Sequence, residues 1–462
     1  MKNSYKTRLN RGLGAALLVT LFAGGLAAQR PTAITNARVL TMAGNAIEQC
    51  TIVIRDGKIA KIGTGVIVPG GALVVDAKGG TVMPGLVSAY SRAGMSGGRP
   101  ATPQRGRGQR RRGRGNRGQR GAAPTGSMGN NAATKVVDGL YARQDVFRDL
   151  LDAGITSLAV APTGAGFPGQ GALLDLTGTD HASLVVDDNA FIAINPANNT
   201  RTKTLVKEAF TLAAEVVEER KNPASGSTTE EETDDRRQQA QRTQQQRRGR
   251  GRRGGGRRGA RGGGGRGQAP QLRKDENTDA LADLLEGKKR GLIALGSATD
   301  VLHYLDAVGE TRFTATILAQ RITPNQGTFD LVLDELRSLS AAVLMAPQLS
   351  QRPNTNQITN PAGDLVGAGF EVGFIIGDSK PAVTGLFGSL IELVRHGLDA
   401  DAALRAVTIV PAKMLGIADQ VGSIETGKAA NLLLWSTDPL NPTAKLVQVW
   451  HEGVDVKEIP KR

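Results

Sequence analysis

Two polar residues that follow a buried apolar run are the first candidates for chemistry in this 462-residue sequence. The run at 82–87 contains a Pro-Gly pair and predicts a buried strand, and Tyr90 and Arg92 lie just beyond it. Residues two apart share one side of a strand, and parallel α/β barrels carry their chemistry at the carboxyl ends of the strands. Tyr90 and Arg92 are therefore predicted to lie together in a pocket.

A carboxylate, Asp378, follows a second predicted strand at 372–376. A single carboxylate there could act as a general base, bind a ligand, or form an ion pair with Arg92 across the mouth of a barrel. We expect the ion pair, because Arg92 carries a fixed positive charge. Tyr90 could donate its phenol to the same cluster or simply cap a layer of the barrel interior.

The histidines give no sign of a metal site. The four are His181, His303, His396 and His451, and none has another histidine two, three or four residues away. A catalytic zinc ion takes at least three nitrogen, sulfur or oxygen ligands from the protein. The sequence therefore predicts no metal ligands and no cofactor.

The elements that would position these residues alternate between strands and helices. Strands are predicted at 155–160, 291–295, 312–318, 342–345 and 372–376, and helices at 145–152, 205–219, 278–285, 298–308, 328–339 and 385–394. Such alternation favours an α/β fold with a parallel sheet and crossover helices. The number of units favours a closed (β/α)8 TIM barrel over an open doubly wound sheet, and we place the barrel at 82–414.

Both chain ends are rich in β signals. Asp56-Gly57 separates two alternating apolar runs, which is a strong hairpin signal. Two more strands are predicted at 430–435 and 445–450. We expect residues 29–81 and 415–462 to build one small composite β-sandwich beside the barrel.

The first 28 residues resemble a signal peptide, with a basic start, an apolar stretch and small residues at the end. The apolar stretch is shorter than the roughly 20 residues that a membrane-spanning helix needs. The sequence thus predicts a periplasmic or secreted protein, with an uncleaved anchor as the alternative. Cys50 is the single cysteine, so no intramolecular disulfide is possible.

Two Arg/Gly-rich inserts, at about 97–130 and 222–274, carry the basic charge. Residues 99–120 and 236–266 of these inserts hold 21 arginines and no acid, which exceeds the formal net charge of +15, so the rest of the chain is net negative. Their composition predicts disorder. They could bind a polyanion or be solvated low-complexity expansions, and nucleic acid is the less expected partner because no aromatic residues interleave with the arginines.

Several segments together resemble the amidohydrolase superfamily, closest to its imidazolonepropionase-like branch. These segments are 33–40, 57–59, 82–87, 406–412 and 422–432. The resemblance implies a metal-dependent (β/α)8 barrel flanked by a composite sandwich. It also implies hydrolysis of C–N bonds in cyclic amides, ureas, imidazolones or dipeptides, with Zn²⁺ or another divalent ion.

The sequence departs from that family at its site. Tyr90 and Arg92 stand where the family has a His-x-His pair, and Asp175 stands where near relatives have a lysine. The stretches 293–297 and 314–321, where the family carries further histidines, have none, and only Asp378 matches a family site residue.

These departures predict a catalytically inactive member in which Tyr90, Arg92 and Asp175 are pocket residues and Asp378 is vestigial. Such a protein would act by binding a small-molecule ligand or a partner subunit, for example a related active enzyme. One alternative is an active metal-dependent amidohydrolase with unusual ligands. A second is a polyanion-binding protein that acts through its inserts.

Overall fold

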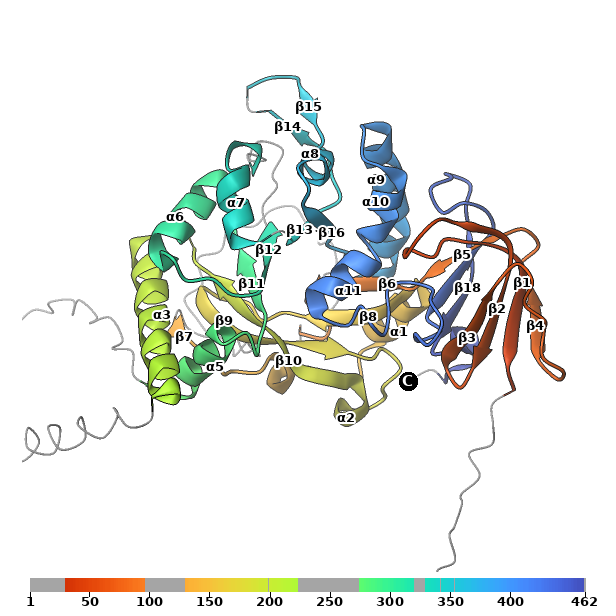
Figure 1. The fold of residues 1–462 in the computed structure, drawn as a ribbon, viewed down its shortest axis with the longest axis horizontal. Helices are drawn as coiled ribbons and strands as arrows, with labels where there is room; N and C mark the ends of the chain where they lie inside the picture. The colour runs from red at the N-terminus through yellow and green to blue at the C-terminus, as the bar shows by residue number, and fades with distance from the viewer. Residues whose placement is uncertain are drawn as a thin grey trace, which may run out of the picture.

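A computed structural model describes residues 30–95, 129–197, 199–222, 274–319, 329–340, 342–352 and 354–460. Figure 1 shows a β unit built from the two chain ends, in red and dark blue, beside a larger α/β body. The leader and most of both Arg/Gly-rich inserts, including the predicted disorder, lie outside the described residues. None of the described helices has both the length and the apolar character needed to cross a membrane.

The large body is a nearly closed barrel of mixed strands. The strands are β6 (Leu86–Ser91), β8 (Ile155–Val160), β9 (Gly166–Leu174), β10 (Val185–Asn195), β11 (Gly291–Ala294), β12 (Ala315–Ala319), β13 (Ala342–Met345) and β16 (Glu371–Phe374), paired in this order, with the short β7 (Gly129–Asn130) beside β9. A turn at 406–407 lies between the two end strands. There, the Phe374 amide donates to the Ala406 carbonyl and the Val87 amide donates to the Val407 carbonyl.

One strand departs from the predicted all-parallel barrel. β9 runs antiparallel to both β8 and β10, whereas the other long strands pair in parallel. Residues 175–184, with the short helix α2 (His181–Leu184), connect β9 to β10. A parallel connection needs a crossover of about a dozen residues or more, so this link is too short and the pair becomes an antiparallel ribbon.

Helices pack around the barrel (Figure 1). They are α1 (Asp145–Asp152), α3 (Thr200–Lys221), α5 (Glu276–Leu285), α6 (Ala298–Val308), α7 (Leu333–Leu339), α8 (Pro361–Gly367), α9 (Lys380–Arg395), α10 (Ala400–Arg405) and α11 (Ile409–Leu415), with 3-10 turns η1 (Val136–Gly139), η3 (Phe329–Leu331) and η4 (Val456–Glu458). A small hairpin joins β14 (Ser350–Gln351) to β15 (Ile358–Thr359). Elements α1, α6, β8 and β13 have their predicted bounds, and the other predicted elements are displaced by a few residues.

The composite β unit confirms that the two chain ends fold together. Its strands are β1 (Thr32–Val39), β2 (Ile47–Arg55), β3 (Lys58–Gly63), β4 (Leu73–Asp76), β5 (Thr81–Pro84), β17 (Leu432–Trp435), β18 (Leu446–His451) and β19 (Val454–Asp455). The antiparallel pairing of β5 with β17 joins the two ends into one sheet. The predicted hairpin is present, and both Asp56 and Gly57 have positive φ, as a type I′ turn requires.

The two units are tied together at the C-terminal tail. The Arg148 guanidinium, on α1, donates to the backbone carbonyls of Val456 at 2.6 Å and Ile459 at 2.7 Å, and it pairs with Asp152 at 2.8 Å. The Arg148 side chain is only 12% exposed, so its charge depends on these acceptors. This contact fixes the last residues of the chain against the barrel.

Candidate functional site

At the mouth of the barrel, Asp378 lies next to the end of the first barrel strand. Asp378 follows β16, and its carboxylate accepts a hydrogen bond from the Ser91 hydroxyl at 2.6 Å and one from the Arg92 backbone amide at 2.9 Å. The Ser91 hydroxyl, which is 1% exposed, also accepts from the Ala93 amide at 2.9 Å. Asp378 therefore stabilises the carboxyl end of β6 through these hydrogen bonds.

The expected ion pair between Arg92 and Asp378 is wrong. Arg92 is exposed, and within the described ranges its guanidinium forms no ion pair; only its backbone amide contacts Asp378. Ser91, which lies between the two predicted pocket residues, supplies the side-chain contact with Asp378. Tyr90 is half-buried and packs against the barrel core. Arg92 and Asp378 do touch, through the Arg92 backbone amide.

Asp175 lies at the other end of the barrel, which corrects its prediction as a pocket residue. Because β9 is antiparallel, its last residue, Leu174, pairs with Leu158, whereas Ser91 pairs with Val160 at the end of β8. Asp175 is one residue further from the mouth, so it lies about 10–13 Å from Arg92 along the strand direction. There it faces the composite β unit.

The Asp175 carboxylate meets His451 of β18. The Asp175 Oδ1 and His451 Nε2 atoms are 3.0 Å apart, but the geometry is not that of a hydrogen bond, so the contact is an ion pair when the imidazole is protonated. Burial raises the pKa of Asp175, but His451 and the hydrogen bonds from Thr177 outweigh it and leave that pKa below its ordinary value. Asp175 is therefore a joint residue between the two units.

The residues at the barrel mouth do not fit the divalent ion that the resemblance implies. The described residues contain no group of three His, Cys, Asp or Glu side chains able to hold a metal ion. Around Asp378 the chain offers a hydroxyl and a backbone amide, which occupy the carboxylate, and an exposed guanidinium, which cannot be deprotonated. Within the described residues, the sequence neighbours and hydrogen-bond partners of Asp378 include no imidazole that would suit zinc.

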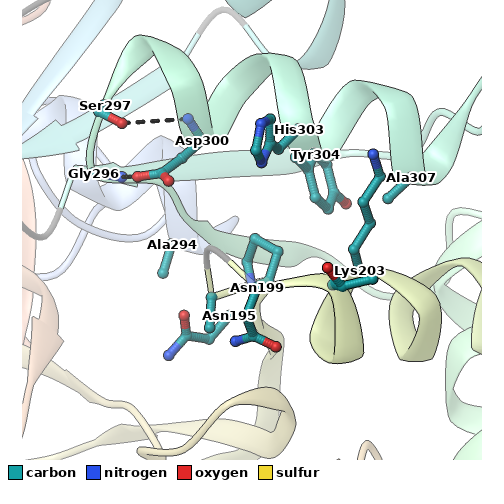
Figure 2. A pocket seen from close by; sticks show the side chains of 13 residues that line it. Asn195, Asn199, Lys203, Ala294, Gly296, Ser297, Asp300, His303, Tyr304 and Ala307 are labelled. Carbon is teal, nitrogen blue, oxygen red and sulfur yellow. Dashed lines mark hydrogen bonds between the residues drawn. The ribbon is translucent and has the colours of Figure 1, made fainter.

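A separate pocket opens where β10 and β11 end (Figure 2). Its volume is about 630 Å³, and it lies between the loop after β10, the start of α3 and the first half of α6. Its polar lining residues are Asn195, Asn199, Thr200, Lys203, Ser297, Asp300, His303 and Tyr304. The pocket does not include Ser91, Arg92 or Asp378, so it is distinct from the barrel mouth.

Most polar groups of this pocket are held by the chain itself. The Asn195 side chain donates to the Gly164 carbonyl at 2.6 Å, and Asp300 Oδ2 accepts from the Gly296 amide at 3.0 Å. Asn199 and Ser297 cap the starts of α3 and α6. Lys203 forms an ion pair with Asp306 of α6.

Tyr304 is the exception. Its side chain is 1% exposed, and its hydroxyl has no hydrogen-bond partner among the described residues. Burial raises the pKa of Tyr304 well above its ordinary value, against a small opposing effect of Arg312, so the phenol remains a protonated donor. In the sequence Tyr304 has the position of a core residue on the buried face of α6, so its residue type and spacing do not mark it as a site residue.

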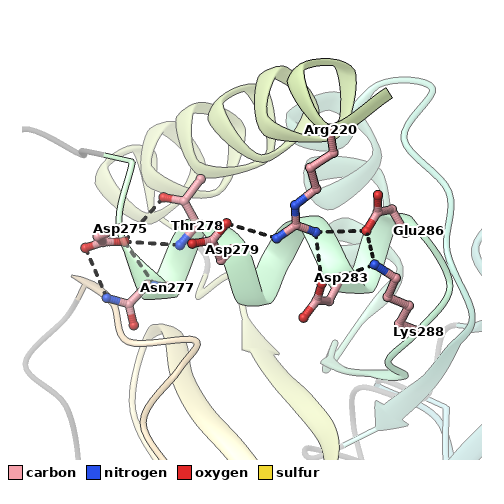
Figure 3. Close-up of polar contacts among 8 residues, drawn as sticks. All are labelled: Arg220, Asp275, Asn277, Thr278, Asp279, Asp283, Glu286 and Lys288. Atoms are coloured by element: carbon pink, nitrogen blue, oxygen red, sulfur yellow. Dashed lines mark hydrogen bonds and ion pairs between the residues drawn. The ribbon is translucent and has the colours of Figure 1, made fainter. Parts of the chain in front are cut away.

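The helix that begins at the pocket is anchored at its far end (Figure 3). Arg220, in the last turn of α3, pairs with three acids of the α5 region, namely Asp279, Asp283 and Glu286, at 2.8–2.9 Å. The network thus joins α3 to α5, which flank residues 223–273 in the sequence.

Parts of this chain are similar to a known protein family and to two curated proteins. Residues 292–457 match the model of the Amidohydrolase family. Two curated relatives match short stretches: amidohydrolase tasK of Hapsidospora irregularis, 43% identical over 58 residues, and 5'-deoxyadenosine deaminase of Methanosarcina mazei, 48% identical over 65 residues. These stretches are 13% and 14% of this chain, and they span only 6% and 15% of the relatives' own lengths.

A solved structure shares the whole fold. The amidohydrolase from Thermotoga maritima superposes with a TM-score of 0.60 at 18% identity, over 92% of this chain and 99% of that one. The likeness is one of fold, with both the barrel and the β unit inside the matched length. The Amidohydrolase family model thus matches the later barrel strands and the C-terminal part, and the fold of nearly the whole chain is shared with the Thermotoga maritima amidohydrolase.

Proposed function

We propose that this chain is a non-catalytic member of the amidohydrolase family that acts by binding a small molecule at the strand-end face of its barrel. The observation that carries the proposal is the state of Asp378. Its carboxylate accepts from Ser91 at 2.6 Å and from the Arg92 amide at 2.9 Å, where the family resemblance would place a metal ion. The carboxylate therefore has a structural role at the end of β6.

The chemistry of the neighbouring side chains supports this reading. Hydrolysis in metal-dependent enzymes relies on a bound ion that lowers the pKa of water, and that ion needs a set of suitable ligands. Tyr90 and Arg92 supply a phenol and a permanent cation in place of two imidazoles. The chain keeps the barrel and a pocket of about 630 Å³, which is within the size range of small-molecule sites.

The principal alternative is an active metal-dependent hydrolase with unusual ligands, since the matched relatives are named as an amidohydrolase and a deaminase. Metal analysis of the purified full chain separates the two. We expect less than one equivalent of Zn, Fe or Mn after dialysis, and no hydrolysis of a panel of dipeptides and cyclic amides. One or more tightly bound equivalents together with hydrolysis would overturn the proposal.

A restored site makes the metal test sharper. The double variant Tyr90→His with Arg92→His would supply two imidazoles on one side of the chain beside Asp378, giving three ligands. We expect this variant to bind Zn²⁺ more tightly than the parent. The same double variant with Asp378→Asn is the matched control, because it keeps both imidazoles and loses the carboxylate.

A second candidate function, polyanion binding, rests on the 21 arginines of residues 99–120 and 236–266 in the two inserts. Deleting residues 99–120 and 236–266 should abolish retention on heparin if the inserts bind polyanions. Unchanged retention would remove this candidate. Export through the leader, a partner subunit and the imidazolonepropionase-like branch remain proposals; amino-terminal sequencing of the exported protein tests the first.

A further inference from the structure

We infer that the pocket between α3 and α6 binds the oxyanion group, carboxylate or phosphate, of a small molecule, with the Tyr304 hydroxyl as a donor. The inference deepens the proposed function, on which it rests for the claim that the barrel face binds a ligand. A metal ion at the barrel mouth would overturn the proposed function and leave this pocket unaffected. The two can therefore fail separately.

Two helices begin at this pocket. Asn199 and Thr200, at the start of the 22-residue α3, line it together with Ser297, the cap of the 11-residue α6. The first amides of a helix have no partner within the helix, and the helix dipole places partial positive charge there. Anions bind at such positions, but a helix start alone does not make a site.

Tyr304 provides the independent observation. Its hydroxyl is buried, has no partner within the described part of the chain, and belongs to a residue that lines the pocket. In Figure 2 the hydroxyl points from α6 toward the side chain of Lys203 on α3. Leaving a buried hydroxyl without a partner costs about 1–3 kcal/mol, and an acceptor atom in the pocket would remove that cost.

The protonation of Tyr304 defines which ligand group fits. Because burial keeps the phenol protonated, Tyr304 can donate a hydrogen bond. The Thr200 amide, at the first position of α3, is also a donor. Donors in the lining of one pocket call for a ligand group that only accepts, and a carboxylate or phosphate oxygen meets that need.

The charged side chains around the pocket restrict which ligands it can bind. Asp300 is the acid of the lining, but its carboxylate is turned to the Gly296 amide at 3.0 Å. Lys203 is engaged by Asp306, and the exposed His303 lies at the rim. The volume of about 630 Å³ exceeds that of a bare ion, so we expect the oxyanion to be one part of a metabolite-sized molecule.

The test measures thermal unfolding of the full chain in phosphate and in acetate, each compared with chloride at equal ionic strength. A site ligand raises the melting temperature with saturation, whereas a general salt effect does not saturate. We expect a saturating rise in at least one oxyanion. A rise in phosphate alone or acetate alone identifies which oxyanion the pocket accepts.

Two variants assign the effect to this pocket. Tyr304→Phe removes only the hydroxyl and should weaken the apparent affinity at least tenfold, while the anion-free protein unfolds at the same or a higher temperature. Thr200→Pro removes one amide at the first position of α3, where proline is tolerated. The extended backbone of Asn199 accommodates a following proline, and the same loss of affinity is expected.

Tyr141→Phe is the matched control, because Tyr141 is 56% exposed and does not line the pocket. It should bind like the parent. If neither anion gives a saturating rise in the parent, the inference is wrong. It is equally wrong if both Tyr304→Phe and Thr200→Pro respond to the anion as the parent does.

Discussion

The contact between Asp378 and the end of β6 leads to a comparison of two substitutions. Asp378→Ala removes two hydrogen bonds, one from the buried Ser91 hydroxyl and one from the Arg92 backbone amide. Hydrogen bonds are worth about 0.5–1.5 kcal/mol each, and those to charged groups more. Asp378 itself is exposed, so water can replace it at the Arg92 amide but less readily at Ser91. We therefore expect a loss of about 1–2 kcal/mol in the free energy of unfolding.

Arg92→Ala should behave differently, because the backbone amide that contacts Asp378 is retained. The exposed guanidinium has no ion pair within the described residues, so the expected change is within about 0.5 kcal/mol. Urea unfolding followed by circular dichroism gives both values, provided that the slope of the transition is unchanged. A loss in Arg92→Ala as large as that in Asp378→Ala would restore the ion pair and refute the backbone contact.

Three further predictions concern contacts outside the barrel mouth. Arg148→Met should lower stability by about 2–4 kcal/mol, because it leaves two tail carbonyls without their charged donor; amide exchange at the tail should rise, and unchanged exchange would contradict this. The lowered pKa of Asp175 gives stability that is present above about pH 4, the unfolded value, and is lost as pH falls through the lower folded value. The stability difference between the parent and Asp175→Asn, measured by urea unfolding, should therefore shrink below pH 4, and a constant difference would exclude this linkage. Arg220→Met should cost less than about 1 kcal/mol at low salt, since its partners are partly exposed, and the cost should disappear in 1 M NaCl if it is electrostatic.

Much of the fold follows from local patterns. The helices α1 and α6 and the strands β8 and β13 have clear apolar periodicity between turn residues, and they lie where the sequence predicts them. The pairing of the chain ends also follows, because the β signals at both ends have no other partners nearby. These elements satisfy local preference and global packing together.

The strands β9 and β10 could not be found in the same way. β9 contains Gly166, Pro168, Gly169 and Gly171, a composition typical of loops, yet the strand is buried throughout. Its glycines are required by tertiary packing. A Cβ atom on Gly171, for example, would lie 2.2 Å from the Phe191 ring of β10. A close approach of two strands is set by their partner, so local propensity does not reveal it.

The same limit explains what was missed at the site. Because β9 runs antiparallel to β8 and β10, Asp175 lies at the joint with the β unit and not at the barrel mouth. A motif position that suggests a ligand-binding residue is therefore a contact with His451. Asn195 reaches the strand-end face only because β10 exists. Residue types at the first barrel strand argue against a family metal site, but the location of a replacement site depends on topology. That dependence is why the pocket of Tyr304, and not the cluster of Tyr90 and Arg92, is the place to look for a ligand.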